Sequence, residues 1–308
     1  CLAALGSDTG GSVRQPAALC GVVGMKPTYG RISRYGLLAY GSSFDQIGTL
    51  TNSVEDAALL LEVMAGKDDF DSTVSQQAVP AYSQALSFKS RAKIAYFKSA
   101  LEHPKLDTEV KTCTDEFIQK LQTQGHQLEA IEFSYLDHII PAYYVLTTAE
   151  ASSNLARYDG VRYGYRSPNA KNLQENYTKT RSEGFGTEVK RRIMLGTFVL
   201  SAGYYDAYYT KAQQVRQLIW QRTKEIFDQY DFILMPASPT PAWDIGQMKD
   251  DPVEMYLSDI FTVHANMVGI PAIALPIGTT QSGLPIGAQF MANRFEEEKL
   301  FGFAKAIS

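Results

Sequence analysis

The pattern of apolar and polar positions predicts short strands separated by amphipathic helices, starting at the first residues of the chain. An apolar run at residues 2–5 predicts a strand that leads into a glycine-rich loop, and turn residues are frequent from there to about Gly48. A helix is predicted over residues 57–65, because Ser53 followed by an acid three residues later is typical of a capping box. Residues 67–90 are polar and are predicted to form a loop.

A strand, a helix and a second strand are predicted next. Residues 94–97 have the composition of a short buried strand. Residues 108–124 carry apolar side chains every three or four positions and stop at Gly125, which predicts a helix. Residues 128–133 predict the second strand, and this order indicates an α/β unit.

The rest of the chain adds further helices and strands. The predicted elements are helices over about residues 141–155, 186–195 and 204–230, a surface excursion over 160–182, strands over 232–236, 272–276 and 286–290, and a last helix from about Glu296. A turn at Ser282-Gly283 joins the last two strands into a hairpin. No internal repeat or low-complexity linker interrupts this order, and the length alone allows one or two domains. Together with the family resemblance described below, the prediction adopted is a single α/β domain over residues 1–308.

Length and composition are those of a globular chain with a large core, with 308 residues of which 45% are hydrophobic. The net charge of −4 argues against a broad nucleic-acid surface, so a partner would have to hold any RNA. The three cysteines lack metal-ligand spacing, and no apolar stretch reaches the roughly 20 residues of a membrane helix. We therefore predict no metal site, no resident cofactor and no membrane contact for this chain.

The loop Gly10-Gly11-Ser12 carries the candidate chemistry. Glycines let successive backbone N–H groups converge on an anion, and a serine beside such a nest has its own oxyanion hole. An isolated Gly-Gly-Ser is nevertheless most often an ordinary turn. The neighbouring charges of Asp8 and Arg14 are expected to pair and to hold the loop rather than to act in catalysis. A Ser-His-Asp triad is the alternative, since triads are recognised by geometry, although the four histidines lie in segments without catalytic character.

The residues around this loop continue into a much longer motif. It consists of the segments Gly6–Ala17, Cys20–Arg31, Ser33–Leu37 and Ser42–Gly48. Together they resemble the signature of the amidase signature family and are far more specific than Gly-Gly-Ser alone. Later segments resemble one branch of that family, the A subunits of glutamyl-tRNA(Gln) amidotransferases: Glu150–Gly160, Val189–Thr197, Ser201–Tyr209 and Gly283–Phe290.

The resemblance implies an amidase-signature fold, in which helices cover both faces of a mixed central β-sheet. It implies that Ser12 is the acyl-ester nucleophile and that the backbone N–H groups of Thr9, Gly10, Gly11 and Ser12 form the oxyanion hole. Members of the family also carry an upstream region with a lysine general base and a second catalytic serine, and neither matches a residue here. Lys26 is not assigned as the base. The chain is therefore expected to be the C-terminal part of an enzyme and inactive by itself.

The resemblance also implies three substrate-binding residues. Arg192 would bind the α-carboxylate of glutamine, Asp259 its α-ammonium group, and Tyr143 would line the pocket. From composition alone, Arg192 belongs to a charge run that is typical of a solvated helix face, whereas Asp259 stands among apolar residues and needs a partner. His264 stands where many relatives are expected to carry proline. The tyrosines within residues 204–209 have helical spacing, and packing is their default role.

The activity implied is that of the glutaminase component of a tRNA-dependent amidotransferase. Glutamine would be hydrolysed to glutamate and ammonia, and a second subunit would use the ammonia and ATP to convert Glu-tRNA(Gln) to Gln-tRNA(Gln). The implied partners are the B and C subunits. The tRNA would bind through the B subunit, and ATP and Mg would be used by the complex on the partner subunit. The implied location is the cytoplasm. One alternative is a stand-alone amidase, which would not need Arg192 and Asp259 for an apolar amide. The other is a catalytically inert module with exposed apolar surface.

Overall fold

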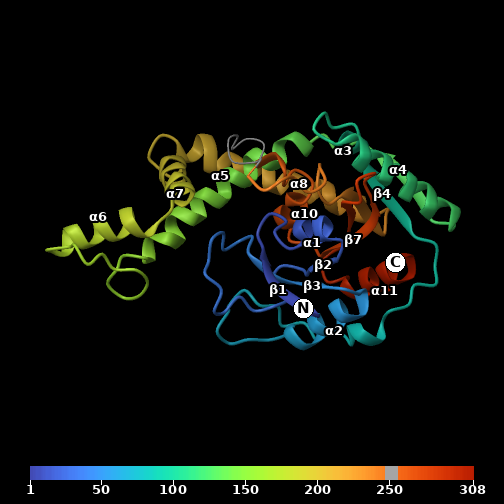
Figure 1. Cartoon of the computed structure of the whole chain (residues 1–308), viewed down its shortest axis with the longest axis horizontal. Helices are drawn as coiled ribbons and strands as arrows, with labels where there is room; N and C mark the ends of the chain where they lie inside the picture. The colour runs from blue at the N-terminus through green and yellow to red at the C-terminus, as the bar shows by residue number, and fades with distance from the viewer. Residues whose placement is uncertain (247–255) are drawn as a thin grey trace. The chain divides into compact units, whose positions relative to one another are not determined.

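The computed structural model describes residues 1–246 and 256–308, and its central element is an eight-stranded sheet (Figure 1). The strands are β1 (Ala3–Asp8), β2 (Val23–Lys26), β3 (Gln46–Thr51), β4 (Lys93–Phe97), β5 (Gln127–Ile131), β6 (Phe232–Pro236), β7 (Ala272–Thr279) and β8 (Pro285–Met291). Their order in the sheet is β1-β3-β2-β7-β8-β6-β4-β5. Strand β4 runs parallel to β5 and β6, and the other neighbouring pairs are antiparallel. The sheet is therefore mixed, as predicted.

The chain forms two compact units. The first comprises Cys1–Gly36, Phe44–Ile140 and Arg216–Ser308 and contains the sheet, and the second comprises Leu37–Ser43 and Pro141–Val215. The helices of the first unit are α1 (Arg14–Cys20), α2 (Val54–Met64), α3 (Lys98–Leu101), α4 (Thr108–Thr123), α10 (Val263–Val268) and α11 (Glu297–Ile307). The second unit contains α6 (Leu173–Gly184) and α7 (Thr187–Val199). Two helices, α5 (Leu136–Asn154) and α8 (Lys211–Phe227), include residues of both units. The organisation as a single domain stays a prediction.

Alternation along the strands places helices on opposite faces of the sheet. On β7, Ile273 and Leu275 belong to the main core cluster, whereas Ala274 between them packs with Ala18 of α1. Residues of α2, α4 and α11 line the main cluster, and α2 and α11 lie beside each other (Figure 1). Helices therefore cover both faces, which confirms the α/β architecture implied by the resemblance.

Elements with strong local signals form where they are predicted. The Ser53 hydroxyl accepts a hydrogen bond from the backbone N–H of Asp56 and so caps α2. Strands β4 and β5 flank α4 and pair in parallel, as the predicted strand–helix–strand unit requires. The last two strands form the predicted antiparallel hairpin. Within the described residues, no helix has the length and hydropathy that crossing a membrane requires.

Elements without a local pattern are the ones that the predictions miss. The stretch before Gly48 is not merely turn-rich, because it contains α1, β2 and the start of β3. Strand β2 has only four residues, all buried, so it shows no alternation of polar and apolar side chains. The predicted surface excursion over 160–182 is mostly exposed, as expected, but the prediction missed α6, which forms there without an apolar stripe. It is supported by the Asn172 cap and by an ion pair between Lys179 and Glu175.

Candidate active site around Ser12

The candidate loop joins the end of β1 to the start of α1. Gly11 has a φ of 131°, a backbone conformation that side chains rarely adopt, and a Cβ placed there would lie 2.1 Å from Oγ1 of Thr262. A glycine is therefore required at position 11 by both backbone and packing. Ser12 follows it in the turn, and its side chain is exposed.

A buried ion pair between Asp8 and Arg14, the residues on either side of this loop, supports it. Oδ1 of Asp8 lies 3.0 Å from Nη2 of Arg14, and both side chains are fully buried. Oδ2 of Asp8 also accepts hydrogen bonds from the backbone N–H groups of Val13 and Arg14, at 3.2 and 3.4 Å. Burial alone would raise the pKa of Asp8, but the Arg14 guanidinium more than offsets it and lowers that pKa to about 2. The predicted pairing of Asp8 and Arg14 across the loop is confirmed.

Arg14 also binds residues from the far end of the chain. Its Nη1 donates to the backbone O of Thr262 at 2.8 Å and to Oε1 of Gln289 at 2.6 Å, and its Nη2 donates to Oδ1 of Asn266 at 2.6 Å. Asn266 in turn donates to Oδ1 of Asp8 at 2.9 Å. Our sequence analysis missed Thr262, Asn266 and Gln289. The available signal was weak, namely polar side chains within apolar segments, which must find partners when buried.

Backbone N–H groups of the loop that take no part in this network are available as hydrogen-bond donors. Among the described residues, the N–H groups of Thr9, Gly10, Gly11 and Ser12 donate to no acceptor. The side chain of Thr9 is held by a hydrogen bond of 2.7 Å to Oδ1 of Asp45. The arrangement is thus an exposed serine beside successive free N–H groups on a buried, hydrogen-bonded support, which suits the binding of an oxyanion.

The segment that carries Asp259 lies against the same loop. The Thr262 hydroxyl donates to the backbone O of Gly10 at 2.7 Å and lies 3.2 Å from the backbone O of Asp259. Nε2 of Gln15 donates to the backbone O of Ser258 at 2.6 Å. Asp259 itself is half-buried. The fold therefore brings the loop of Ser12 and the Asp259 segment together from opposite ends of the chain.

Arg192 and Tyr143 belong to the second compact unit. Nε of Arg192 lies 2.8 Å from Oε1 of Glu188, and its Nη1 donates to the Tyr40 hydroxyl at 2.9 Å. Burial by itself would lower the pKa of Arg192, but Tyr40 and Glu188 more than offset it, so the pKa lies above its ordinary value. Tyr143 is buried, and its ring stands edge-on to that of Tyr144 at 5.1 Å. Arg192 is thus a half-buried, partnered cation rather than a member of a solvated helix face.

Lys26 is buried in β2 but serves as a structural donor. Its Nζ donates to the backbone O of Pro27 at 2.8 Å, to Oε1 of Gln46 at 3.1 Å and to the backbone O of Ile270 at 2.5 Å. Burial, helped by the positive charge of Arg14, lowers its pKa to about 7. Its three acceptors all hold the sheet and neighbouring segments together, so the structure gives no reason to assign it as the base of Ser12.

His264 is fully buried and packs as an aromatic side chain. Its ring lies 5.3 Å from that of Phe97 and 5.0 Å from that of Phe133, and its Nε2 is 2.7 Å from Oγ1 of Thr223. Burial lowers the pKa of His264 to about 3. Within the described ranges, no histidine makes a hydrogen bond to Ser12, and no group of three or more His, Cys, Asp or Glu could hold a metal ion.

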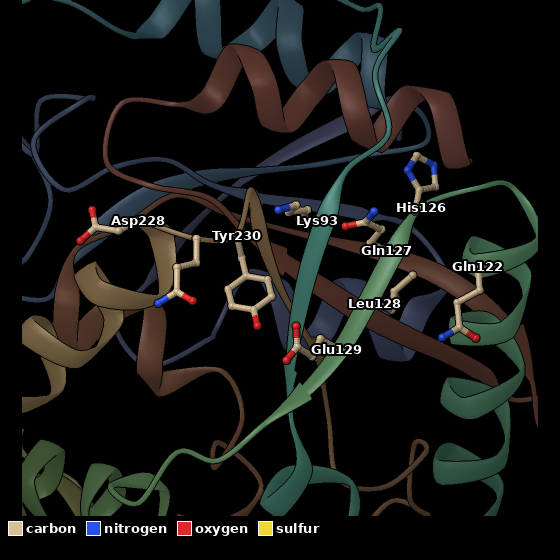
Figure 2. A pocket seen from close by; sticks show the side chains of 9 residues that line it. Lys93, Gln122, His126, Gln127, Leu128, Glu129, Asp228 and Tyr230 are labelled. Atoms are coloured by element: carbon tan, nitrogen blue, oxygen red, sulfur yellow. The ribbon is translucent and has the colours of Figure 1, made fainter.

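A separate cavity of about 800 Å³ lies at the amino ends of β4 and β5 (Figure 2). Its lining mixes charges of both signs with amides, including Lys93, Gln127 and Asp228. Figure 2 shows Tyr230 facing Glu129, and a hydrogen bond to Glu129 raises the pKa of Tyr230. Ligands of open α/β sheets bind at the opposite, carboxyl ends of the strands. This cavity therefore has the character of a solvated surface hollow, and the loop of Ser12 is the stronger candidate site.

Comparison with known proteins gives a consistent set of relatives. The Amidase family model matches residues 1–301. The chain is 53% identical over its whole length to the A subunit of glutamyl-tRNA(Gln) amidotransferase from Chlorobaculum parvum, and 54% identical over 99% of its length to the corresponding A subunit from Syntrophus aciditrophicus. It covers 64% and 63% of these relatives, so it spans somewhat less than two thirds of their length.

Solved structures show the same fold. The A subunit of the Thermotoga maritima glutamyl-tRNA(Gln) amidotransferase superposes with a TM-score of 0.79 at 43% identity, over 99% of this chain and 62% of the other. An allophanate hydrolase of Kluyveromyces lactis superposes with a TM-score of 0.80 over 99% of this chain and 46% of the other, at 22% identity, which shows a shared fold alone.

Proposed function

The chain belongs to the amidase family, and from that premise we propose that it is the glutamine-hydrolysing part of a tRNA-dependent amidotransferase, with Ser12 as its nucleophile. The observation that carries the catalytic part is the exposed Ser12 on a loop whose N–H groups are free and whose support is the buried pair of Asp8 and Arg14. Identity above 50% to the A subunits of glutamyl-tRNA(Gln) amidotransferases supports the choice of this branch.

The proposed reaction proceeds through an acyl ester. Oγ of Ser12 adds to the carboxamide carbon of glutamine while its proton passes to a general base, and the amide oxygen becomes an oxyanion facing the N–H groups of residues 9–12. The C–N bond then breaks as the nitrogen takes up the proton, and ammonia leaves. Water adds to the ester carbon, the C–O bond to Ser12 breaks, and glutamate is released. By resemblance, the general base is a lysine that acts through a second serine, both outside residues 1–308.

Three residues are proposed to hold the substrate. The planar guanidinium of Arg192 suits the α-carboxylate of glutamine, and the half-buried carboxylate of Asp259 suits its α-ammonium group. Tyr143 is proposed to line the same pocket. The proximity of the Asp259 segment to the nucleophile loop supports the role of Asp259 in particular.

The proposed setting is a complex with B and C subunits in the cytoplasm. The ammonia would pass to the B subunit, which would bind tRNA, ATP and Mg and amidate Glu-tRNA(Gln). The net charge of −4 on this chain supports placing the RNA on a partner.

The test is ammonia release from glutamine by the full-length protein that contains this chain. Ser12→Ala is expected to lower kcat/KM by about 10³-fold or more, because the nucleophile is lost, without changing the folded state. Ser134→Ala is the matched control, since Ser134 is another exposed serine in a turn. A folded Ser12→Ala variant with unchanged activity would move the nucleophile elsewhere.

A second variant separates the glutaminase from a stand-alone amidase. Arg192→Met is expected to abolish most activity on glutamine while leaving hydrolysis of an apolar primary amide within a few-fold, because only glutamine presents an α-carboxylate. Equal losses on both substrates would contradict the proposed role of Arg192. Efficient hydrolysis of the apolar amide by the unmodified protein, with none of glutamine, would favour the stand-alone amidase.

A further inference from the structure

Helix α7 carries Arg192 on the side that packs against α5 (Figure 1). A Cβ on Gly196, one turn after Arg192, would lie 1.9 Å from the backbone O of Thr148 in α5, so the two helices are in close backbone contact there. The ring of Tyr144, also on α5, lies 5.8 Å from the guanidinium carbon of Arg192. The side chain of Arg192 therefore lies over α5 and is only 25% exposed.

Tyr40 binds this guanidinium from a distant part of the sequence. Nη1 of Arg192 donates to the Tyr40 hydroxyl at 2.9 Å, and the Tyr40 ring lies 5.5 Å from the guanidinium carbon, which is within the range of a cation–π contact. Nε of Arg192 donates to Oε1 of Glu188, one turn earlier on the same helix, at 2.8 Å. Because Nε and Nη1 are different corners of a planar group, the two hydrogen bonds together fix the orientation of its plane.

The segment that carries Tyr40 is itself bound to the end of α5. Nδ2 of Asn154 donates to the backbone O of Tyr40 at 3.1 Å and to Oγ of Ser42 at 2.8 Å. The carboxylate of Glu150, one turn earlier on α5, accepts hydrogen bonds from the backbone N–H of Ser43 at 2.9 Å and from its hydroxyl at 2.5 Å. The backbone on both sides of the Tyr40 side chain is thus fixed by polar contacts within the second unit.

A guanidinium held in one orientation suits the binding of a carboxylate. Its planar fork binds carboxylates through two parallel N–H···O hydrogen bonds, so the strength of binding depends on the direction of the plane. A mobile arginine loses conformational freedom when a ligand fixes it, and contacts that fix it beforehand reduce that cost. A tyrosine hydroxyl provides such a contact without the negative charge of a further carboxylate, which would repel the ligand.

We propose that Tyr40 is a positioning residue for substrate binding, whose hydroxyl orients the guanidinium of Arg192 toward the α-carboxylate of glutamine. The proposal rests on the proposed function, in which Arg192 binds that carboxylate. Tyr40 acts through Arg192 and not on the reacting amide. It therefore contributes to the binding of substrates that carry an α-carboxylate and not to the chemistry at Ser12.

The test is the kinetics of ammonia release from glutamine by the full-length protein. Tyr40→Phe keeps the ring and removes only the hydroxyl. It is expected to raise KM about tenfold and to leave kcat within twofold, because the ground state and the transition state lose the same contact. Tyr35→Phe is the matched control, since Tyr35 is 68% exposed, and it is expected to change neither constant.

A merely structural role of Tyr40 predicts the opposite split. Loss of folded protein lowers the apparent kcat and leaves KM unchanged, because the remaining folded molecules bind glutamine normally. That result, or unchanged values of both constants in Tyr40→Phe, would overturn the proposal.

A double-variant cycle tests whether Tyr40 acts through Arg192. In Arg192→Lys the positive charge remains but the planar fork is gone, so the hydroxyl has no plane to orient. Adding Tyr40→Phe to Arg192→Lys is therefore expected to raise KM by less than a further twofold. If the two effects on KM multiply in full, Tyr40 acts independently of Arg192 and the proposal is wrong.

Binding of L-glutamate, measured by calorimetry on the full-length protein, separates this proposal from the proposed function because it needs no turnover. Weaker binding in both Arg192→Met and Tyr40→Phe, with no ammonia released by the unmodified protein, would reject the function and keep the positioning role. Normal kinetics in Tyr40→Phe, with Ser12→Ala inactive, would keep the function and reject the positioning role. A protein that neither hydrolyses glutamine nor binds glutamate would reject both.

Discussion

Two ion pairs of this chain both join an arginine to a carboxylate, but one is buried and the other is exposed to solvent. In the sheet unit, Arg14 and Asp8 are 3.0 Å apart and fully buried. In the helical unit, Arg191 and Glu188 are 2.5 Å apart on a solvated helix, with the arginine side chain about half exposed. Water replaces a broken exposed pair at little cost, whereas nothing replaces the partner of a buried charge. The comparison indicates that the loop of Ser12 rests on a buried ion pair whose loss would be costly, whereas the Arg191–Glu188 pair contributes little to the stability of its unit.

The largest expected effect comes from breaking the buried pair. Arg14→Met is expected to lower the free energy of unfolding by about 3–5 kcal/mol, because the Asp8 carboxylate stays buried without its cation. Urea denaturation followed by circular dichroism measures the change. The double variant Asp8→Asn/Arg14→Met is expected to recover part of the loss, since the unpaired charge is gone. A loss below about 1 kcal/mol for Arg14→Met would contradict the contrast between the two units.

The next effect concerns the glycine that the loop requires. Gly11→Ala is expected to cost about 3 kcal/mol, from its positive φ and from the collision with Thr262. Gly36→Ala is the matched control, because Gly36 has a φ of 91° but no atom within 4 Å of an added Cβ. The difference between the two variants in urea denaturation isolates the collision. Equal costs would show that Thr262 moves aside and that the loop is less tightly held than the distances indicate.

An intermediate, pH-dependent effect is expected from the buried His264. Its pKa falls from near 6.5 when unfolded to about 3 when folded, so the unfolded chain alone takes up a proton between these values. Stability should therefore decline as the pH falls below 6.5, by about 1.4 kcal/mol per unit, and be fully present above it. His264→Phe is expected to reduce the loss of stability between pH 7 and pH 5 by about 2 kcal/mol. The same loss in both proteins would exclude His264 as its source.

The smallest effect is expected at the exposed pair. Arg191→Met is expected to change the free energy of unfolding by about 0.5 kcal/mol or less, because the pair is solvated and screened by salt. Repeating the denaturation at high salt should remove even that difference. A loss comparable to that of Arg14→Met would mean that exposure does not distinguish the two pairs.

Local signals explain which elements could be predicted from the sequence. The capping serine of α2, the apolar spacing of α4 and the turn between β7 and β8 each lie within a few residues of the element they specify. Strand β2 and helix α10 have no such signal, because they are short and completely buried, so their side chains show no polar face. Their structure depends on neighbours that come from distant parts of the chain.

The residues of the candidate site can also be separated into those that the sequence predicts and those that only the structure identifies. The sequence by itself determined the family resemblance, the choice of Ser12 and the pairing of Asp8 with Arg14, since those residues stand together in one motif. Only the tertiary structure decided that Asn266 and Gln289 complete the partners of Arg14, 252 and 275 residues away along the chain. It also decided that Arg192 is half-buried beside Tyr40. The physical reason is that burial and long-range hydrogen bonding belong to the assembled sheet and helices, whereas spacing and composition act only between neighbours in the sequence.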